Sequence, residues 1–200
     1  MTAPQTVSEL ADRMRDGDLV FFKGTSLISK VIAAMGGCPV THVGMIAKVD
    51  LNPRAKSVLL LEMREFIGGR MVSLANEVEN RKGEMYWIPL DPLNRFDLDR
   101  DAIVDKMVEF TGKQYNYWQV IRAGISHLPF LRFFFKPSLE DVLSKDLPLF
   151  CSACCGYAIQ HGGHDTVHFL ANAWTEPCDL YRSLIHDGNE TQLKGMSQPR

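Results

Sequence analysis

A cysteine near the start of a predicted helix is the residue in this chain most clearly suited to covalent chemistry. Pro148 disfavours helix in the residue before it, whereas the segment from Cys151 to His161 can form a helix that Gly162 closes. Cys151 then lies in the first helical turn, where unpaired N–H groups and the helix dipole favour a thiolate. A nucleophile is expected at such a position; the alternative is a small apolar residue packed beneath a sheet.

A histidine on an early predicted strand could serve as the base. Over residues 41 to 49, the alternation of a strand places His42 on one face with Gly44 and Ile46, and Val43 on the other. Gly44 has no side chain, so another element can approach this face closely, and the start of the cysteine helix could fit there. The alternative for a strand histidine is a purely structural role.

The next predicted strand ends in a carboxylate. Val58, Leu60 and Glu62 share one of its faces. A carboxylate at the end of an apolar strand is costly to bury unless a positive or hydrogen-donating group meets it. The imidazole of His42 would meet that need, whereas a glutamate at a solvated strand end would need no partner.

Several short motifs occur in an order that resembles the circularly permuted NlpC/P60 proteins. These are papain-like cysteine hydrolases and acyltransferases, including the YiiX-like proteins and the lecithin-retinol acyltransferase relatives, in which the histidine strand precedes the cysteine helix. The resemblance covers about residues 16 to 183, including a segment, residues 174 to 180, similar to the family's Thr-Pro-x-Asp-Leu ending. The other motifs are Gly17-Asp18-Leu19-Val20-Phe21, Thr41-His42-Val43-Gly44-Met45-Ile46, Leu61-Glu62-Met63, Gly112-Lys113-Gln114-Tyr115-Asn116 and Phe150-Cys151-Ser152.

The resemblance implies roles for individual residues. Cys151 is the nucleophile, His42 is the base, and Glu62 is the residue that orients the imidazole. Tyr115 is a weaker candidate, as a hydrogen-bond donor near the oxyanion. The chain has Ala153 where the family often has a glutamate. We expect no cofactor and no metal in such a site.

The function expected from these residues is that of a cysteine hydrolase, a peptidase or amidase that forms a thioester acyl-enzyme on cell-wall-type peptides. One alternative is an acyltransferase or a lipid thioesterase or esterase, because a thioester intermediate serves amides and esters alike. Another is a non-catalytic binding module or virion protein of the same fold. The aromatic segment 128 to 136 could be an acyl-chain surface or ordinary packing.

Two further patterns include the same cysteine. Cys151 and Cys154 form a C-x-x-C pair, which is typical of dithiol redox proteins when it follows an early strand in a βαβ unit. Cys151, Cys154, His161 and His164 also read as a zinc pattern, but the spacer between the two pairs is shorter than a Cys₂His₂ site usually has. Both remain alternatives to the hydrolase.

The pattern of elements predicts an α+β fold of the papain-like, permuted NlpC/P60 type. Extended runs dominate the first half and helices the second, which favours an antiparallel sheet with helices packed on one side. We find no linker or repeat, so residues 1 to 200 are expected to form a single domain. The predicted strands cover residues 19 to 22, 41 to 49, 57 to 63, 70 to 74 and 84 to 90, and the predicted helices lie near residues 7 to 14, 26 to 35, 103 to 110 and 151 to 161.

Composition narrows the class of partner. The formal net charge of -2 provides no basic surface for nucleic acid, so the expected partner is a peptide-like or acyl-lipid substrate. We find no signal peptide and no apolar run long enough to span a membrane, which predicts a cytoplasmic protein without an integral membrane segment. The five cysteines are predicted to be thiols rather than a disulfide framework. The pattern does not indicate an oligomeric state.

Overall fold

The computed structural model of the chain describes residues 6–24, 37–52, 55–91, 93, 97–115, 150–165, 175–184 and 190–194. In this part the strands form one six-stranded sheet in the order β4-β3-β2-β1-β5-β6, and every neighbouring pair is antiparallel. The strands are β1 (Leu19–Lys23), β2 (His42–Asn52), β3 (Ala55–Arg64), β4 (Gly68–Ser73), β5 (Glu84–Ile88) and β6 (Thr191–Lys194). The predicted α+β class with an antiparallel sheet is confirmed.

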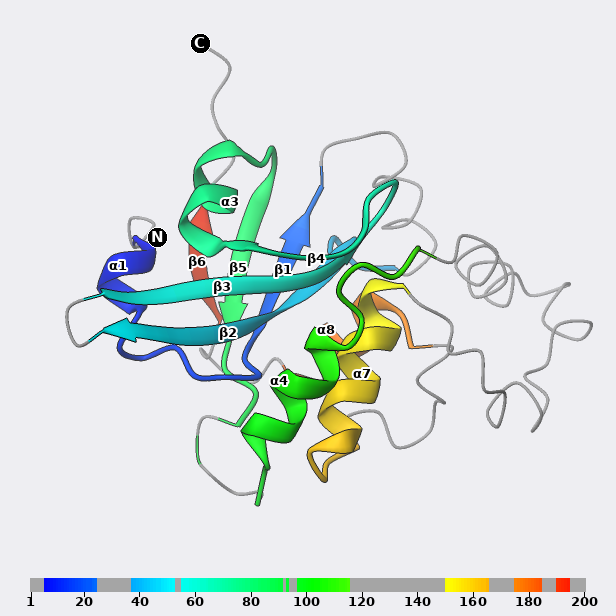
Figure 1. Ribbon diagram of the computed structural model, residues 1–200. Helices are drawn as coiled ribbons and strands as arrows, with labels where there is room; N and C mark the ends of the chain where they lie inside the picture. Colours follow the sequence, from blue (N-terminus) through cyan, green and yellow to red (C-terminus); the bar gives the residue numbers. More distant parts are fainter. Residues whose placement is uncertain are drawn as a thin grey trace, which may run out of the picture.

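Helices cover both faces of the sheet (Figure 1). The described helices are α1 (Val7–Leu10), α3 (Leu74–Asn80), α4 (Arg100–Val108), α7 (Cys151–His161) and α8 (Pro177–Leu184). Leu19 and Phe21 of β1 face α4, α7 and α8, whereas Val20 and Phe22 face α1 and α3. The prediction of helices on one side is therefore wrong for α1 and α3, because the strands are apolar on both faces and each face must be covered.

The elements around the candidate site follow the sequence pattern closely. Helix α7 begins at Cys151 and ends at His161, with Gly162 as its C-cap residue, as predicted. It buries Cys154, Ala158 and other residues at helical spacing against β2 and α4. The predictions that concern residues 26 to 35 and 128 to 136 lie outside the described residues.

A buried aspartate fixes the start of β1 against the second half of the chain. Asp18 is fully buried and accepts hydrogen bonds from the indole Nε1 of Trp87 at 3.0 Å and the backbone N–H of Leu90 at 3.2 Å. Arg100 of α4 lies 3.1 Å from the same carboxylate. Burial raises the pKa of Asp18, and the hydrogen bonds and Arg100 oppose that rise. The Gly-Asp motif thus joins β1, the end of β5 and α4.

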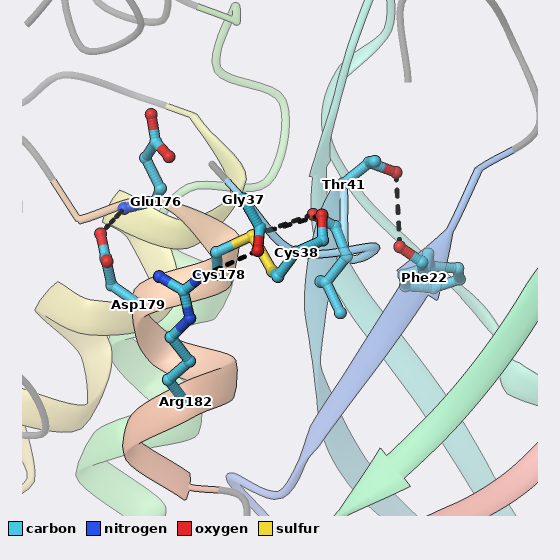
Figure 2. Close-up of a disulfide and its surroundings, with 9 residues drawn as sticks. Phe22, Gly37, Cys38, Thr41, Glu176, Cys178, Asp179 and Arg182 are labelled. Carbon is cyan, nitrogen blue, oxygen red and sulfur yellow. Dashed lines mark hydrogen bonds between the residues drawn. A yellow bond between two sulfur atoms is a disulfide. The ribbon is translucent and has the colours of Figure 1, made fainter. Parts of the chain in front are cut away.

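Two cysteines that we predicted to be thiols form a disulfide. Figure 2 shows Cys178 on α8 bonded to Cys38, which precedes β2, with their Cα atoms 6.0 Å apart. The Cys178 sulfur also lies 3.4 Å from the carbonyl oxygen of Val40. The two cysteines are separated by 140 positions, so their pairing depends on the fold and not on local spacing. Cys151, Cys154 and Cys155 are free thiols, as predicted.

No helix in the described part of the chain combines the length and apolar character needed to cross a bilayer.

Candidate active site

The candidate nucleophile begins helix α7. Phe150 is the N-cap residue, and its side chain accepts no hydrogen bond from the N–H groups of the first turn. Cys151 is the next residue and is 4% exposed. Its position in the first turn of a helix of 11 residues matches the prediction.

The candidate base and its orienting carboxylate are in direct contact. Nε2 of His42, the first residue of β2, lies 2.6 Å from Oε2 of Glu62 near the end of β3. Their side chains are 9% and 0% exposed, respectively. The predicted pairing of His42 with Glu62 is therefore present in the structure.

Gly44 makes room for β3 and not for the cysteine helix. A Cβ atom at Gly44 would lie 2.7 Å from Cδ1 of Leu60 and 3.2 Å from Cβ of Glu62. Cys151 instead packs with Val43 on the opposite face of β2. The predicted approach of the helix to the Gly44 face is wrong, because side chains of the neighbouring strand already fill that space.

The pKa of His42 depends on Cys151 as well as on Glu62. Burial disfavours the charged imidazolium, but the charge of Cys151 and hydrogen bonds to Cys151 and Glu62 outweigh burial and raise the pKa of His42 from 6.5 to about 9. Since Nε2 is bonded to Glu62, Nδ1 is the ring nitrogen left for the sulfur. The imidazole is therefore protonated at neutral pH and bonded to an ionised carboxylate.

Glu62 lies in a network of arginines that the sequence analysis did not anticipate. It accepts hydrogen bonds from Arg70, including one of 2.8 Å from Nε, and one of 2.7 Å from Nη1 of Arg81. Glu77 of α3 bonds to Arg70 at 2.7 Å and lies 3.5 Å from Arg81. Burial raises the pKa of Glu62, but His42 and Arg81 outweigh it and hold that pKa well below its usual range. The carboxylate is thus ionised at any pH at which the protein would work.

One of these arginines had a signal in the sequence and the other had none. Arg70 lies opposite Glu62 in the register of β3 and β4, and a weak strand was predicted there. Arg81 follows α3, a helix that the pattern did not indicate. Its guanidinium also lies 3.9 Å from the centre of the Phe22 ring.

An open cleft of about 770 Å³ reaches His42. Of the catalytic candidates, His42 is among the residues that line this cleft, whereas Cys151 is not and has little exposed surface. The described residues that line the cleft are Phe22, Gly24, Thr41, His42, Arg64, Glu65, Phe66, Ile67, Asn80, Arg81 and Lys82.

A solved structure shares this arrangement of sheet and helices. The metalloprotein YiiX from Escherichia coli O157:H7 superimposes with a TM-score of 0.50 at 16% sequence identity, over 76% of this chain and 68% of that one. The chain has a YiiX-like fold. This agrees with the resemblance found in the motifs, and at this level of identity the match concerns the fold alone. A scan against known protein families and a search of curated proteins found no match.

YiiX is a metalloprotein, which raises the question of a metal in this YiiX-like fold. Among the described residues, no group of three or more His, Cys, Asp or Glu side chains is arranged to hold a metal ion. The oxygens of Glu62 are bonded to His42 and to arginines instead. The residues that the structure describes at this site do not fit a metal ion, so we derive no step through one.

The other cysteines of α7 are buried thiols. Cys154 and Cys155 are both fully buried. Burial and nearby thiol groups raise the pKa of each well above its ordinary value. Because a thiolate is the reactive form, the structure gives no support to Cys154 as a redox partner of Cys151.

Tyr115 lies near the site without a defined part in it. The residue is partly buried and packs against the core cluster that contains Cys151. Its predicted role as a donor near the oxyanion stays a prediction.

The pKa of His42 predicts how activity depends on pH. Proton donation to a leaving group needs the imidazolium, so we expect kcat/KM to fall as the pH rises through about 9. Because the folded-state pKa is raised, the contribution of His42 to stability is fully present below about pH 6.5 and is lost as the pH rises through about 9. In Glu62→Gln the charge that raises the pKa of His42 is lost, so kcat/KM should begin to fall at a lower pH. Measurement of kcat/KM against pH for both proteins tests this prediction. A fall of kcat/KM near pH 6.5 in the unmodified protein would contradict it.

Proposed function

We propose that this protein is a papain-like cysteine hydrolase that cleaves peptide-like amides through a thioester acyl-enzyme. One observation carries the proposal: a buried His42 is bonded to Glu62, and Glu62 together with Cys151 at a helix N-terminus raises the pKa of His42 to about 9. A charged imidazole is costly to bury, and a purely structural histidine would not need a thiol and a carboxylate on its two sides. The YiiX-like fold supports the proposal but carries no activity by itself.

The reaction would proceed in two halves. The Cys151 thiolate attacks the carbonyl carbon, and the backbone N–H of Cys151 can donate to the developing oxyanion. The imidazolium of His42 gives its proton to the leaving amine, which leaves the acyl group on sulfur and His42 neutral. His42 then removes a proton from water, the hydroxide attacks the thioester, and collapse returns the carboxylic acid product, the thiolate and the imidazolium. Glu62 holds the ring orientation and stabilises its charge throughout.

Cell-wall-type peptides are the substrates to test first. We expect purified protein to release peptide fragments from muropeptides, followed by mass spectrometry, and Cys151→Ala to release none. Intact muropeptides after prolonged incubation with the unmodified protein, together with cleavage of another substrate class, would contradict this choice of substrate.

A second candidate is an acyl-lipid esterase, thioesterase or acyltransferase, and one observation favours it. Phe66 and Ile67, in the turn between β3 and β4, are 82% and 59% exposed and line the same cleft as His42. Exposed apolar side chains beside a nucleophile could cover an acyl chain. Parallel incubation with long-chain acyl lipids separates the two candidates. Lipid cleavage alone, lost in Phe66→Ser, would replace the amide proposal.

The compartment in which the protein works can be tested through its cysteines. The sequence predicts a cytoplasmic protein, whereas disulfides are rare in the reducing cytosol. With Cys38 and Cys178 paired, three of the five cysteines are free, so acid-quenched cells labelled with a maleimide mass tag should yield three tags per chain. Five tags would show both residues reduced and would support the cytoplasmic prediction instead. A Cys38→Ser, Cys178→Ser variant calibrates the three-tag species.

A further inference from the structure

The cleft beside His42 has more positive than negative side chains along its walls. Arg64, Arg81 and Lys82 line it, and Glu65 is the carboxylate among its described lining residues. His42 adds a further positive charge when protonated. A cleft lined mostly by one sign of charge concentrates ligands of the other sign.

Of the three arginines near Glu62 and Glu77, Arg64 makes the weakest ion pairs with these buried carboxylates. In the network behind the cleft, three guanidinium groups share two glutamates, so one positive charge is left over. Arg64 lies 3.5 Å from Oε1 of Glu77 and 4.0 Å from Oε1 of Glu62, whereas Arg70 and Arg81 each make a contact of 2.7 Å with one of these glutamates. Its side chain is 33% exposed, compared with 15% for Arg81.

The surroundings of Arg64 favour an incoming anion. Burial and the neighbouring positive charges of Arg81 and Arg70 lower the pKa of Arg64. An anion at this guanidinium would relieve that repulsion, and a planar guanidinium can hold a carboxylate or phosphate through two hydrogen bonds.

Lys82 supplies a second cation on the wall formed by the end of α3. It is exposed, and no ion pair joins it to another residue in the described part of the chain. Phe66 and Ile67 line the same cleft and lie in the turn that follows Arg64. The cleft therefore combines two available cations with an apolar surface.

We propose that this cleft binds an anionic group of the substrate, a carboxylate or a phosphate, at Arg64 and Lys82, with an adjoining apolar part of the substrate against Phe66 and Ile67. The inference rests on the proposed function, because it takes His42 as the point where the bound acyl group meets the catalytic pair. It makes the substrate an anionic acyl compound, such as a peptide with a free carboxylate or a lipid with a phosphate headgroup.

Binding of small, non-hydrolysable probes tests the site without any turnover. Hexanoate, hexyl phosphate and neutral hexanol share one apolar chain, and their affinities for the unmodified protein can be measured by ligand-observed NMR at low salt. We expect at least one of the two anions to bind about tenfold or more tightly than hexanol, with the preference reduced by added salt. A preference for hexanoate alone indicates a carboxylate, and one for hexyl phosphate alone indicates a phosphate.

Matched variants locate the binding. Arg64→Gln with Lys82→Gln should remove the preference for the anion, whereas Lys48→Gln with Lys106→Gln removes the same charge at residues that do not line the cleft and should retain it. Equal affinity for anion and hexanol, or a preference that survives the Arg64 and Lys82 changes, overturns the inference. Because no probe is hydrolysed, failure of the hydrolase proposal does not alter this result. Conversely, Cys151-dependent cleavage without anion preference would leave the hydrolase proposal intact.

Discussion

Replacement of Cys151 by alanine, or of His42 by alanine, is expected to lower kcat/KM by about 10⁴-fold or more, the scale seen when an acyl-enzyme hydrolase loses its nucleophile or base. Without Cys151 no thioester can form, and without His42 no group donates a proton to the leaving amine. Turnover of the substrate identified by mass spectrometry measures the loss. Circular dichroism and a thermal melt check that each variant remains folded.

Cys154→Ala is the matched control for Cys151→Ala. Both residues lie in the first half of α7 and are buried, but Cys154 has neither the helix terminus nor the imidazole. We expect this variant to keep nearly full activity after correction for any loss of folded protein. If it were as inactive as Cys151→Ala, dithiol chemistry of the C-x-x-C pair would replace the hydrolase mechanism.

Loss of the Glu62 carboxylate should affect both activity and stability. Glu62→Gln keeps an acceptor for the imidazole but loses the charge that stabilises imidazolium, so we expect kcat/KM to fall by about 10 to 100-fold and a measurable remnant to persist. Glu62→Ala removes both and leaves Glu77 as the carboxylate that remains in contact with Arg70 and Arg81. It should lower the free energy of unfolding by about 3 to 5 kcal/mol, measured by urea denaturation.

Glu77→Gln separates the two effects of Glu62. Glu77 bonds to the same arginines but has no contact with His42 among the described interactions. We therefore expect Glu77→Gln to lower stability while the pH at which activity declines stays near 9. If the pH profiles of Glu62→Gln and Glu77→Gln were the same, Glu62 would not act through the imidazole.

Local rules were enough to single out Cys151, His42 and Glu62 and to predict the elements that hold them, whereas the role of Tyr115 followed only from the family resemblance. Helix α7 was predicted from the proline before its start and the glycines after its end. Alternation along each of the two strands predicted which face carries His42 and which carries Glu62. These rules did not predict which face of β2 the helix α7 packs against. The helix packs on the Val43 face, and Gly44 is filled by β3, because contact between layers depends on the volumes of side chains from several elements.

The environment of Glu62 was harder to predict for a different reason. A buried carboxylate requires positive partners, and this requirement is visible in the sequence. Which arginines supply them depends on the register of β4 and on the place where α3 ends, and neither is encoded near Glu62. The same holds for Cys38 and Cys178, whose pairing requires α8 to lie beside the segment before β2.

The disulfide also encloses both members of the proposed catalytic pair in one covalent ring. Cys38 precedes His42, and Cys178 follows Cys151, so the bond spans both. A single proteolytic cut between His42 and Cys151 would leave two fragments still joined by sulfur, one carrying the base and the other the nucleophile. The pair would separate only when the disulfide is reduced. A nicked chain should therefore run at full length on a non-reducing gel and retain a complete site, provided that the core remains folded.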